Sequence, residues 1–122
     1  MSPVRVLIAD DDPLFLEALE AILGIEAQIE VAGRANHGDE AIRLADELEP
    51  DVVLMDLSMP VVDGFEASRR IRAATPATAV IVLTGSSNAQ DVEKAYDAGA
   101  AGYVTKDRIA KDLVRAVLAA DA

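Results

Sequence analysis

The sequence predicts an α/β fold in which five parallel strands form one doubly wound sheet with helices on both faces. Strand and helix signals alternate five times along the 122 residues, which is the pattern of repeated strand–helix units. Two strand signals, VVLM and AVIVL, are continuously apolar, as expected of central strands buried on both faces. A chain of this length can bury a core by itself, and we interpret residues 1–122 as a single domain.

The first strand–helix unit has a clear boundary between its two elements. The strand is expected at Val4–Ala9, and the helix begins at the Asp12-Pro13 pair. Aspartate accepts hydrogen bonds from the free N–H groups at a helix start, and proline is tolerated in the first helical position. The helix ends at Gly24, and its predicted apolar face comprises Leu14, Ala18, Leu19, Ile22 and Leu23.

The second unit is less apolar than the first. Ile29–Ala32 is a weak strand expected at a sheet edge, and His37 lies in the polar loop after it as a surface turn residue. The following helix closes before Pro50, because the residue before a proline disfavours helical backbone. Its core-facing residues are predicted to be Ala41, Ile42, Ala45 and Leu48.

The other three units have the same order of elements. Central strands are expected at Val52–Met55 and Ala79–Leu83, and a short strand at Gly102–Val104. A turn with Met59-Pro60 and Asp63-Gly64 precedes a helix through Phe65, Ser68, Ile71 and Arg72. A loop is expected over Thr84–Ala89. The helix after it is predicted to end at Gly99 and to have inward-facing residues at Val92, Ala95 and Tyr96. The final helix is expected to begin at a cap residue, Asp107, and to bury Ile109, Leu113, Ala116 and Val117.

The composition excludes several classes of function. The formal net charge is -11 and no basic patch is present, so this domain is not expected to bind nucleic acid directly. The chain has no cysteine, which excludes disulfides and thiolate zinc sites. No apolar run approaches the ~20 residues of a membrane span. No signal-peptide pattern is present either, so we expect a cytoplasmic protein without a membrane association.

Polar side chains follow four of the predicted strands at the point where each strand ends. These residues are Asp10 and Asp11, Asp56, Thr84 and Lys106. Because the carboxyl ends of parallel strands meet at one edge of a sheet, we expect the five side chains to lie together. Three convergent carboxylates repel one another, and Mg²⁺ would relieve that repulsion. Carboxylates, a hydroxyl and an ammonium group therefore predict a site for a divalent cation and a phosphoryl group.

With these residues in place, the whole chain resembles a response-regulator receiver domain of the CheY-like type. The similar segments are IADDDPLF, DVVLMDLSMPVVDGFEA, VLTG and AGAAGYVTKD, which occur in the family's order. Within the family, DDxPLF and GAAGYxxKD are most similar to the receivers of NarL/LuxR-type transcriptional regulators. The resemblance implies a flavodoxin-like sheet with strand order 2-1-3-4-5 and a site at the carboxyl ends of the strands.

The resemblance also implies a phosphoacceptor that a sensor histidine kinase phosphorylates on Asp56 in a Mg²⁺-dependent reaction. The Asp56 carboxylate would attack phosphorus and form an acyl phosphate. Asp11, Asp56 and the backbone carbonyl of Ser58 would be direct metal ligands, and Asp10 would act mostly through a metal-bound water. Asp12, by contrast, is interpreted as the helix cap.

Thr84 and Lys106 would contact the phosphoryl oxygens, as a hydroxyl donor and a point positive charge. In the family a Thr/aromatic pair couples the site to the face of the fourth helix, fifth strand and fifth helix, and Tyr103 is the aromatic residue here. The domain would catalyse its own phosphorylation and dephosphorylation and would not turn over an external substrate. Asp107 stands where many receivers have proline, so the cis peptide bond before that proline does not carry over.

Several alternatives stay open. A regulator of transcription would carry a helix-turn-helix DNA-binding output domain beyond the C-terminus, which we expect, whereas a stand-alone receiver would signal by protein contact. A haloacid-dehalogenase-like phosphohydrolase would use Asp10 as its nucleophile and would leave Asp56 without a role. A pseudo-receiver would be a folded scaffold with an inactive site. Whether the domain forms a homodimer is also open.

Overall fold

The computed structural model of the protein describes residues 2–59, 62–85 and 88–121. Within these residues the strands are β1 (Val4–Ala9), β2 (Ile29–Ala35), β3 (Val52–Asp56), β4 (Ala79–Thr84) and β5 (Gly102–Thr105). The helices are α1 (Pro13–Gly24), α2 (Gly38–Leu48), α3 (Gly64–Ala74), α4 (Ala89–Asp97) and α5 (Ile109–Asp121). A short 3-10 turn, η1 (Lys106–Arg108), lies between β5 and α5.

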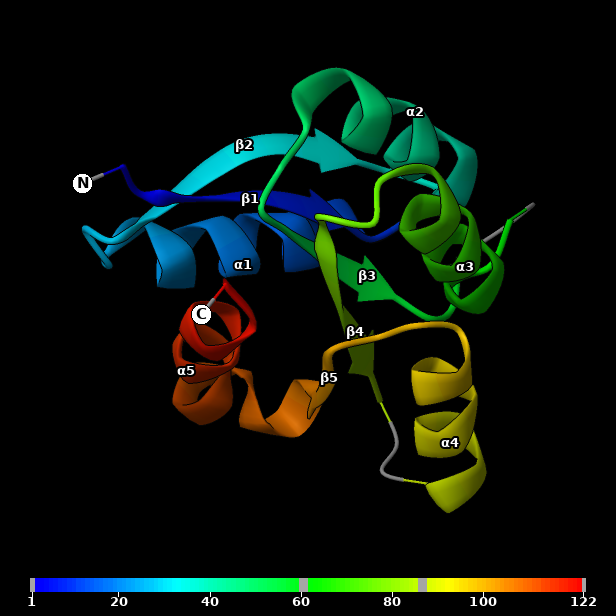
Figure 1. The fold of residues 1–122 in the computed structure, drawn as a ribbon. Coiled ribbons are helices and arrows are strands. Elements are labelled where there is room, and N and C mark those ends of the chain that lie inside the picture. The colour runs from blue at the N-terminus through cyan, green and yellow to red at the C-terminus, as the bar shows by residue number, and fades with distance from the viewer. Residues whose placement is uncertain (1, 60–61, 86–87, 122) are drawn as a thin grey trace.

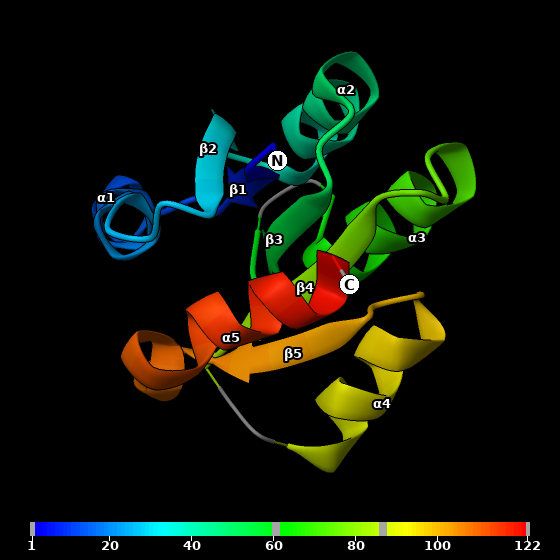
Figure 2. The same ribbon diagram turned by 60° about the vertical axis from the view of Figure 1, so that its left-hand side comes forward.

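The strands form one parallel sheet in the order β2-β1-β3-β4-β5 (Figure 1). Helices α1 and α5 cover one face of the sheet, and α2, α3 and α4 cover the other, as the two views in Figures 1 and 2 show. The predicted flavodoxin-like, doubly wound α/β fold is therefore confirmed. No helix in the described ranges is both long and apolar enough to cross a membrane.

Successive strand residues point to opposite faces of the sheet, so the central strands contribute side chains to two separate cores. On the α1–α5 side, Ile8 and Leu54 pack with Leu19 and Leu113, all of them buried. On the α2–α4 side the core contains small helix residues against strand residues, among them Leu7, Val53, Met55, Ala41, Ala45 and Ala67. All five residues of β3 are buried, as predicted for a strand covered on both faces.

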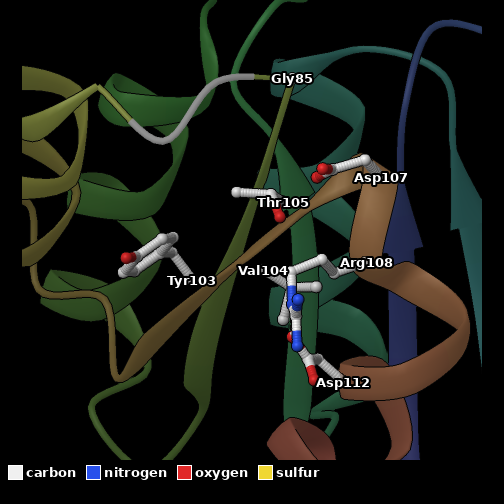
Figure 3. A pocket seen from close by; sticks show the side chains of 7 residues that line it. All are labelled: Gly85, Tyr103, Val104, Thr105, Asp107, Arg108 and Asp112. Carbon is white, nitrogen blue, oxygen red and sulfur yellow. Dashed lines mark hydrogen bonds and ion pairs between the residues drawn. The ribbon is translucent and has the colours of Figure 1, made fainter.

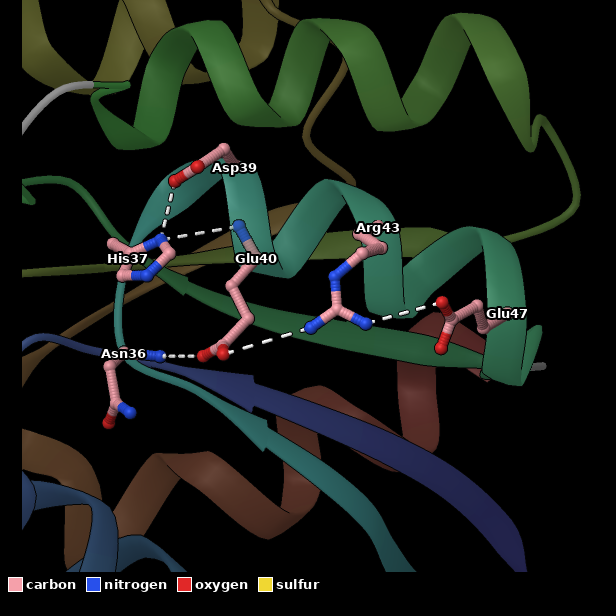
Figure 4. A network of polar contacts seen from close by, with 6 residues as sticks. All are labelled: Asn36, His37, Asp39, Glu40, Arg43 and Glu47. Carbon is pink, nitrogen blue, oxygen red and sulfur yellow. Dashed lines mark hydrogen bonds and ion pairs between the residues drawn. The ribbon is translucent and has the colours of Figure 1, made fainter.

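The helix starts are capped by side chains. Asp12 accepts a hydrogen bond from Leu14 N–H at 3.0 Å, with Pro13 in the first helical turn, which confirms the predicted cap of α1. His37 is half-exposed, and its role goes beyond the surface turn that we predicted. Its Nδ1 accepts a hydrogen bond from Glu40 N–H at 3.3 Å and thereby caps α2, and the ring also contacts Asp39 (Figure 4).

The predicted apolar face of α1 is wrong in two positions. Leu14 is 75% exposed and Ala18 is also exposed, whereas the buried residues of this helix are Leu16, Leu19 and Leu23. The two sets share Leu19 and Leu23 and both have helical spacing, so the apolar pattern is compatible with two rotations of the helix about its axis. The direction of the helix after β1 selects between them, and this direction is a tertiary property.

Two predictions near the C-terminal part of the sheet are also wrong. Tyr96, predicted to face inward, is 49% exposed and packs edge-on against Tyr103 at a centroid distance of 6.2 Å. Asp107 does not cap α5, because it lies inside η1, and this extra turn displaces the start of α5 to Ile109. The described residues contain no cis peptide bond, so the Lys106-Asp107 bond is trans.

Strand β2 is longer than predicted, since it continues to Ala35. Pairing with β1 explains the extension, because Ala9 lies opposite Ala35. The register shifts between Val6 and Leu7, and the pairing with β1 continues beyond this irregularity. Helix α2 begins at Gly38, earlier than the apolar pattern indicated. In the predicted turn before α3, Pro60 lies outside the described residues.

Candidate functional site

Three carboxylates converge at the carboxyl ends of β1 and β3. Ala9 pairs with Met55, so Asp10 and Asp56 follow at the same level on adjacent strands. One oxygen from each of Asp10, Asp11 and Asp56 lies within 4.8 Å of the other two. Asp10 and Asp56 are buried and Asp11 is exposed, so the cluster has one side that solvent can reach. The predicted convergence of these three side chains is present.

Lys106 lies between the two buried carboxylates. Its Nζ is 3.1 Å from Oδ2 of Asp10 and 3.0 Å from Oδ1 of Asp56, and its side chain is 30% exposed. Burial alone would lower the pKa of Lys106, but the hydrogen bonds to Asp56 and Asp10 outweigh burial and raise this pKa. The ammonium group is therefore charged at neutral pH and neutralises part of the carboxylate charge.

Asp10 has both carboxylate oxygens occupied. Its Oδ1 accepts a hydrogen bond from Asp12 N–H at 2.9 Å, and Oδ2 accepts one from Lys106. Burial raises the pKa of Asp10, and the nearby charge of Asp56 adds to this effect, while the two hydrogen bonds oppose it. The net result is a raised pKa of Asp10, so keeping this carboxyl group ionised in the site costs free energy.

Asp56 differs from Asp10 in the surroundings of one carboxylate oxygen. Its Oδ1 pairs with Lys106, whereas Oδ2 is buried and has no hydrogen-bond partner among the described residues. A buried carboxylate oxygen without a partner is unfavourable, and such atoms in native proteins commonly serve a ligand or a reaction. The three carboxylates offer the oxygen donors that hard divalent cations such as Mg²⁺ prefer, so this acidic pocket fits such an ion.

Thr84 and Ser58 lie at the same edge of the sheet. Asp56 pairs with Leu83, so Thr84 is one residue beyond the partner of Asp56, and it is buried. Ser58 is exposed, two residues after Asp56, in the loop that leads to α3. The structure thus places all the residues of the predicted phosphoryl and metal site at the ends of β1, β3, β4 and β5.

Gly64 is a site residue that sequence reasoning missed. A Cβ atom at this position would lie 2.2 Å from the carbonyl oxygen of Asp56 and 2.7 Å from Cα of Leu57. Only glycine allows the start of α3 to approach the β3 backbone so closely, and Gly64 N–H donates to Leu57 O at 3.1 Å. The Asp63-Gly64 pair was a visible signal, but we interpreted it only as a turn.

A surface pocket of about 610 Å³ lies beside β5 (Figure 3). It is lined by residues that adjoin the site, including Gly85 after Thr84, and by Tyr103, which Figure 3 shows pointing away from Arg108 and Asp112. Tyr103 is 37% exposed. The predicted switch residue therefore borders a cavity and is not fixed in the core.

Comparison with known proteins gives consistent results. The model of the response regulator receiver domain family matches residues 6–118. The uncharacterized transcriptional regulatory protein YxjL of Bacillus subtilis is 38% identical over 117 residues, which cover 96% of this chain and 54% of the relative. The chain spans about half the length of the curated relatives that it matches.

Two solved structures illustrate the similarity of fold. The signal receiver domain of NarL from Mycobacterium tuberculosis has a TM-score of 0.94 at 33% identity, covering 99% of this chain and 98% of that one. The isolated REC domain of RcsB from Salmonella enterica serovar Typhimurium, determined in the presence of phosphomimetic BeF₃⁻, has a TM-score of 0.88 at 29% identity, covering 97% of this chain and 88% of that one. The predicted similarity to NarL/LuxR-type receivers is confirmed, and this chain belongs to the receiver domain family of two-component response regulators, with relatives that regulate transcription.

Proposed function

We propose that the domain is a phosphoacceptor whose nucleophile is the carboxylate of Asp56. The observation that supports this most directly is the buried Oδ2 of Asp56, which has no hydrogen-bond partner in the part of the chain that the structure describes, while Lys106 holds Oδ1 in place. That oxygen has lone pairs available to attack phosphorus. In the reaction Oδ2 forms a bond to phosphorus, the bond from phosphorus to the leaving atom of the donor breaks, and the electron pair departs with the donor.

The acidic pocket is proposed to hold Mg²⁺ during this reaction. Asp11, Asp56 and the carbonyl of Ser58 would be its protein ligands, with Asp10 acting through water. When bound, Mg²⁺ supplies positive charge to the phosphoryl oxygens. The convergence of three carboxylates supports this assignment.

Lys106 and Thr84 are proposed to stabilise the phosphoryl group after transfer. Lys106 is already at the site, and its ammonium can exchange a carboxylate oxygen for a phosphoryl oxygen. Water later attacks phosphorus, the bond to Asp56 breaks, and inorganic phosphate leaves. The domain thus promotes its own phosphorylation and dephosphorylation by positioning and charge, and it is not a turnover enzyme.

The donor is proposed to be a phosphohistidine on a sensor histidine kinase, in the cytoplasm. The relatives named as transcriptional regulatory proteins are about twice the length of this chain. We therefore propose that the domain regulates transcription through a helix-turn-helix output domain outside residues 1–122. The net charge of -11 supports an indirect role, since phosphate contacts in DNA require lysine and arginine.

The decisive experiment is intact-mass analysis after incubation with a small acyl-phosphate donor, with Mg²⁺ or with a chelator. We expect a single phosphoryl adduct that requires Mg²⁺, and tandem mass spectrometry should locate it on Asp56. An adduct on another residue, or one formed equally well in the chelator, would contradict the proposal. If the donor gives no adduct, transfer from a phosphorylated histidine kinase is the second assay.

Tyr103 is proposed to transmit the phosphorylated state. As Thr84 moves toward the phosphoryl group, Tyr103 would turn from its half-exposed position against Tyr96 into the space that Thr84 leaves. We expect Tyr103→Ala to take up the phosphoryl group at about the wild-type rate but to lose phosphorylation-dependent association, measured by analytical ultracentrifugation with and without BeF₃⁻. Unchanged association in this variant would contradict the coupling.

A further inference from the structure

The Lys106 ammonium has a third neighbour besides the two carboxylates. Its Nζ lies 4.3 Å from the centroid of the Phe15 ring, a distance typical of a cation–π contact. Phe15 is the third residue of α1, just after the Asp12 cap and Pro13, and its half-buried ring packs against the core on that side. The ring therefore has a fixed position relative to the segment that also bears Asp10.

The three neighbours of Lys106 differ in what becomes of them during the proposed reaction. Asp56 is a proposed direct ligand of Mg²⁺ and also becomes the phosphoryl acceptor, whereas Asp10 is proposed to act on Mg²⁺ through a water molecule. The attraction of both carboxylates for Lys106 would therefore weaken, because Asp56 would carry the phosphoryl group and Asp10 would face a second cation. The face of an aromatic ring attracts a cation but has no lone pair that a metal or a phosphoryl group would occupy. Among the contacts of Lys106 in the described residues, the Phe15 contact involves neither carboxylate, so metal binding and phosphorylation leave it unchanged.

We propose that Phe15 is a positioning residue, which keeps the Lys106 ammonium directed at the site when metal binding and phosphorylation weaken the attraction of the two carboxylates for it. This inference rests on the proposed phosphoacceptor function. A ring at this position also covers one side of the ammonium and reduces its access to water, which strengthens its interaction with a phosphoryl oxygen.

The chain contains a matched control pair. Lys94 Nζ lies 5.7 Å from the ring of Phe65, but Lys94 is exposed and forms no ion pair with the site carboxylates. Phe65, like Phe15, is a half-buried phenylalanine in the first turn of its helix. Phe65→Leu therefore reproduces the loss of an aromatic ring next to a lysine without changing the surroundings of Lys106.

The test compares phosphoryl uptake rates from a small acyl-phosphate donor at saturating Mg²⁺. We expect Phe15→Leu to lower the rate about tenfold, Phe15→Tyr to stay near wild type because its ring retains a π face, and Phe65→Leu to change the rate less than about twofold. In a Lys106→Ala background, the further change Phe15→Leu should have no effect, since the group that it positions is absent. Mg²⁺ affinity, measured by calorimetry, should be the same in all Phe15 variants.

Three results would overturn the proposal. These are an unchanged uptake rate in Phe15→Leu, an equal loss of rate when Phe15→Leu is added to Lys106→Ala, or a rate in Phe15→Tyr as low as that in Phe15→Leu. Failure of the phosphoacceptor function itself would be distinct, because the wild type would then show no adduct with either the small donor or a phosphorylated histidine kinase. A second measurement is independent of phosphoryl transfer. The ring current of Phe15 should shift the ε-methylene protons of Lys106 upfield in the NMR spectrum, both without ligand and with Mg²⁺ and BeF₃⁻, and absence of this shift in the BeF₃⁻ state would contradict positioning.

Discussion

Replacement of Asp56 by asparagine is expected to abolish phosphoryl uptake completely. The amide group of asparagine is not a nucleophile, and no other carboxylate in the described residues has a buried oxygen without a partner at this place. The asparagine side chain is nearly the same size as the aspartate that it replaces and could still accept a hydrogen bond from Lys106, so the fold should persist. Intact-mass analysis of both proteins after incubation with the acyl-phosphate donor and Mg²⁺ measures the effect directly.

Asp10→Asn is the matched control for this experiment, and it also tests the haloacid-dehalogenase-like alternative. That mechanism requires Asp10 as nucleophile, yet both Asp10 oxygens accept hydrogen bonds, from Asp12 N–H and from Lys106. We expect Asp10→Asn to retain phosphoryl uptake, slowed by about 10- to 100-fold through weaker metal binding. An adduct that survives in Asp56→Asn and disappears in Asp10→Asn would identify a hydrolase and reject the receiver mechanism.

Gly64→Ala is expected to have the largest effect on stability. The added Cβ would lie 2.2 Å from the carbonyl oxygen of Asp56, and a backbone atom in a central strand cannot move without displacing the strand. We expect a loss of about 3 kcal/mol in the free energy of unfolding, measured by urea denaturation. The φ angle of Gly64 is not positive, so the effect arises from lack of space and not from backbone strain.

Gly24→Ala is the control for the Gly64 substitution. Gly24 ends α1, its φ is not positive, and a Cβ there would have no neighbour within 4 Å. Alanine should therefore be neutral or add about 0.5 kcal/mol of stability through its higher helix propensity. If both variants unfolded at the wild-type urea concentration, the close approach of α3 to the end of β3 would not be a constraint on this protein.

The sequence predicted those features that depend on strand order and strand ends. Apolar runs located the strands to within a few residues. Polar residues directly after them located the site, because the carboxyl ends of all the parallel strands lie at the same edge of the sheet. The convergence of Asp10, Asp11, Asp56 and Lys106 required no knowledge of side-chain packing. It followed from the rule that parallel strands end at the same edge of a sheet.

Features that depend on how one element is rotated against another were not predictable in this way. The apolar pattern of α1 was compatible with two rotations of the helix, and Leu14 was assigned to the wrong face. Tyr96 was predicted to face inward together with Val92 and Ala95, yet it packs on Tyr103 at the surface. The contacts of Phe15 and Gly64 join elements whose relative placement only the three-dimensional structure gives.

The ion pair between Asp10 and Lys106 joins residues that are 96 positions apart in a chain of 122. Contacts of such long sequence separation form late in folding, because the entropy of closing a long loop opposes them until the intervening strands have paired. A chain emerging from the ribosome cannot form this contact before its last strand has been made. A nascent or partly folded molecule would therefore have the carboxylates without their lysine. The site can function only in a molecule whose whole sheet has formed.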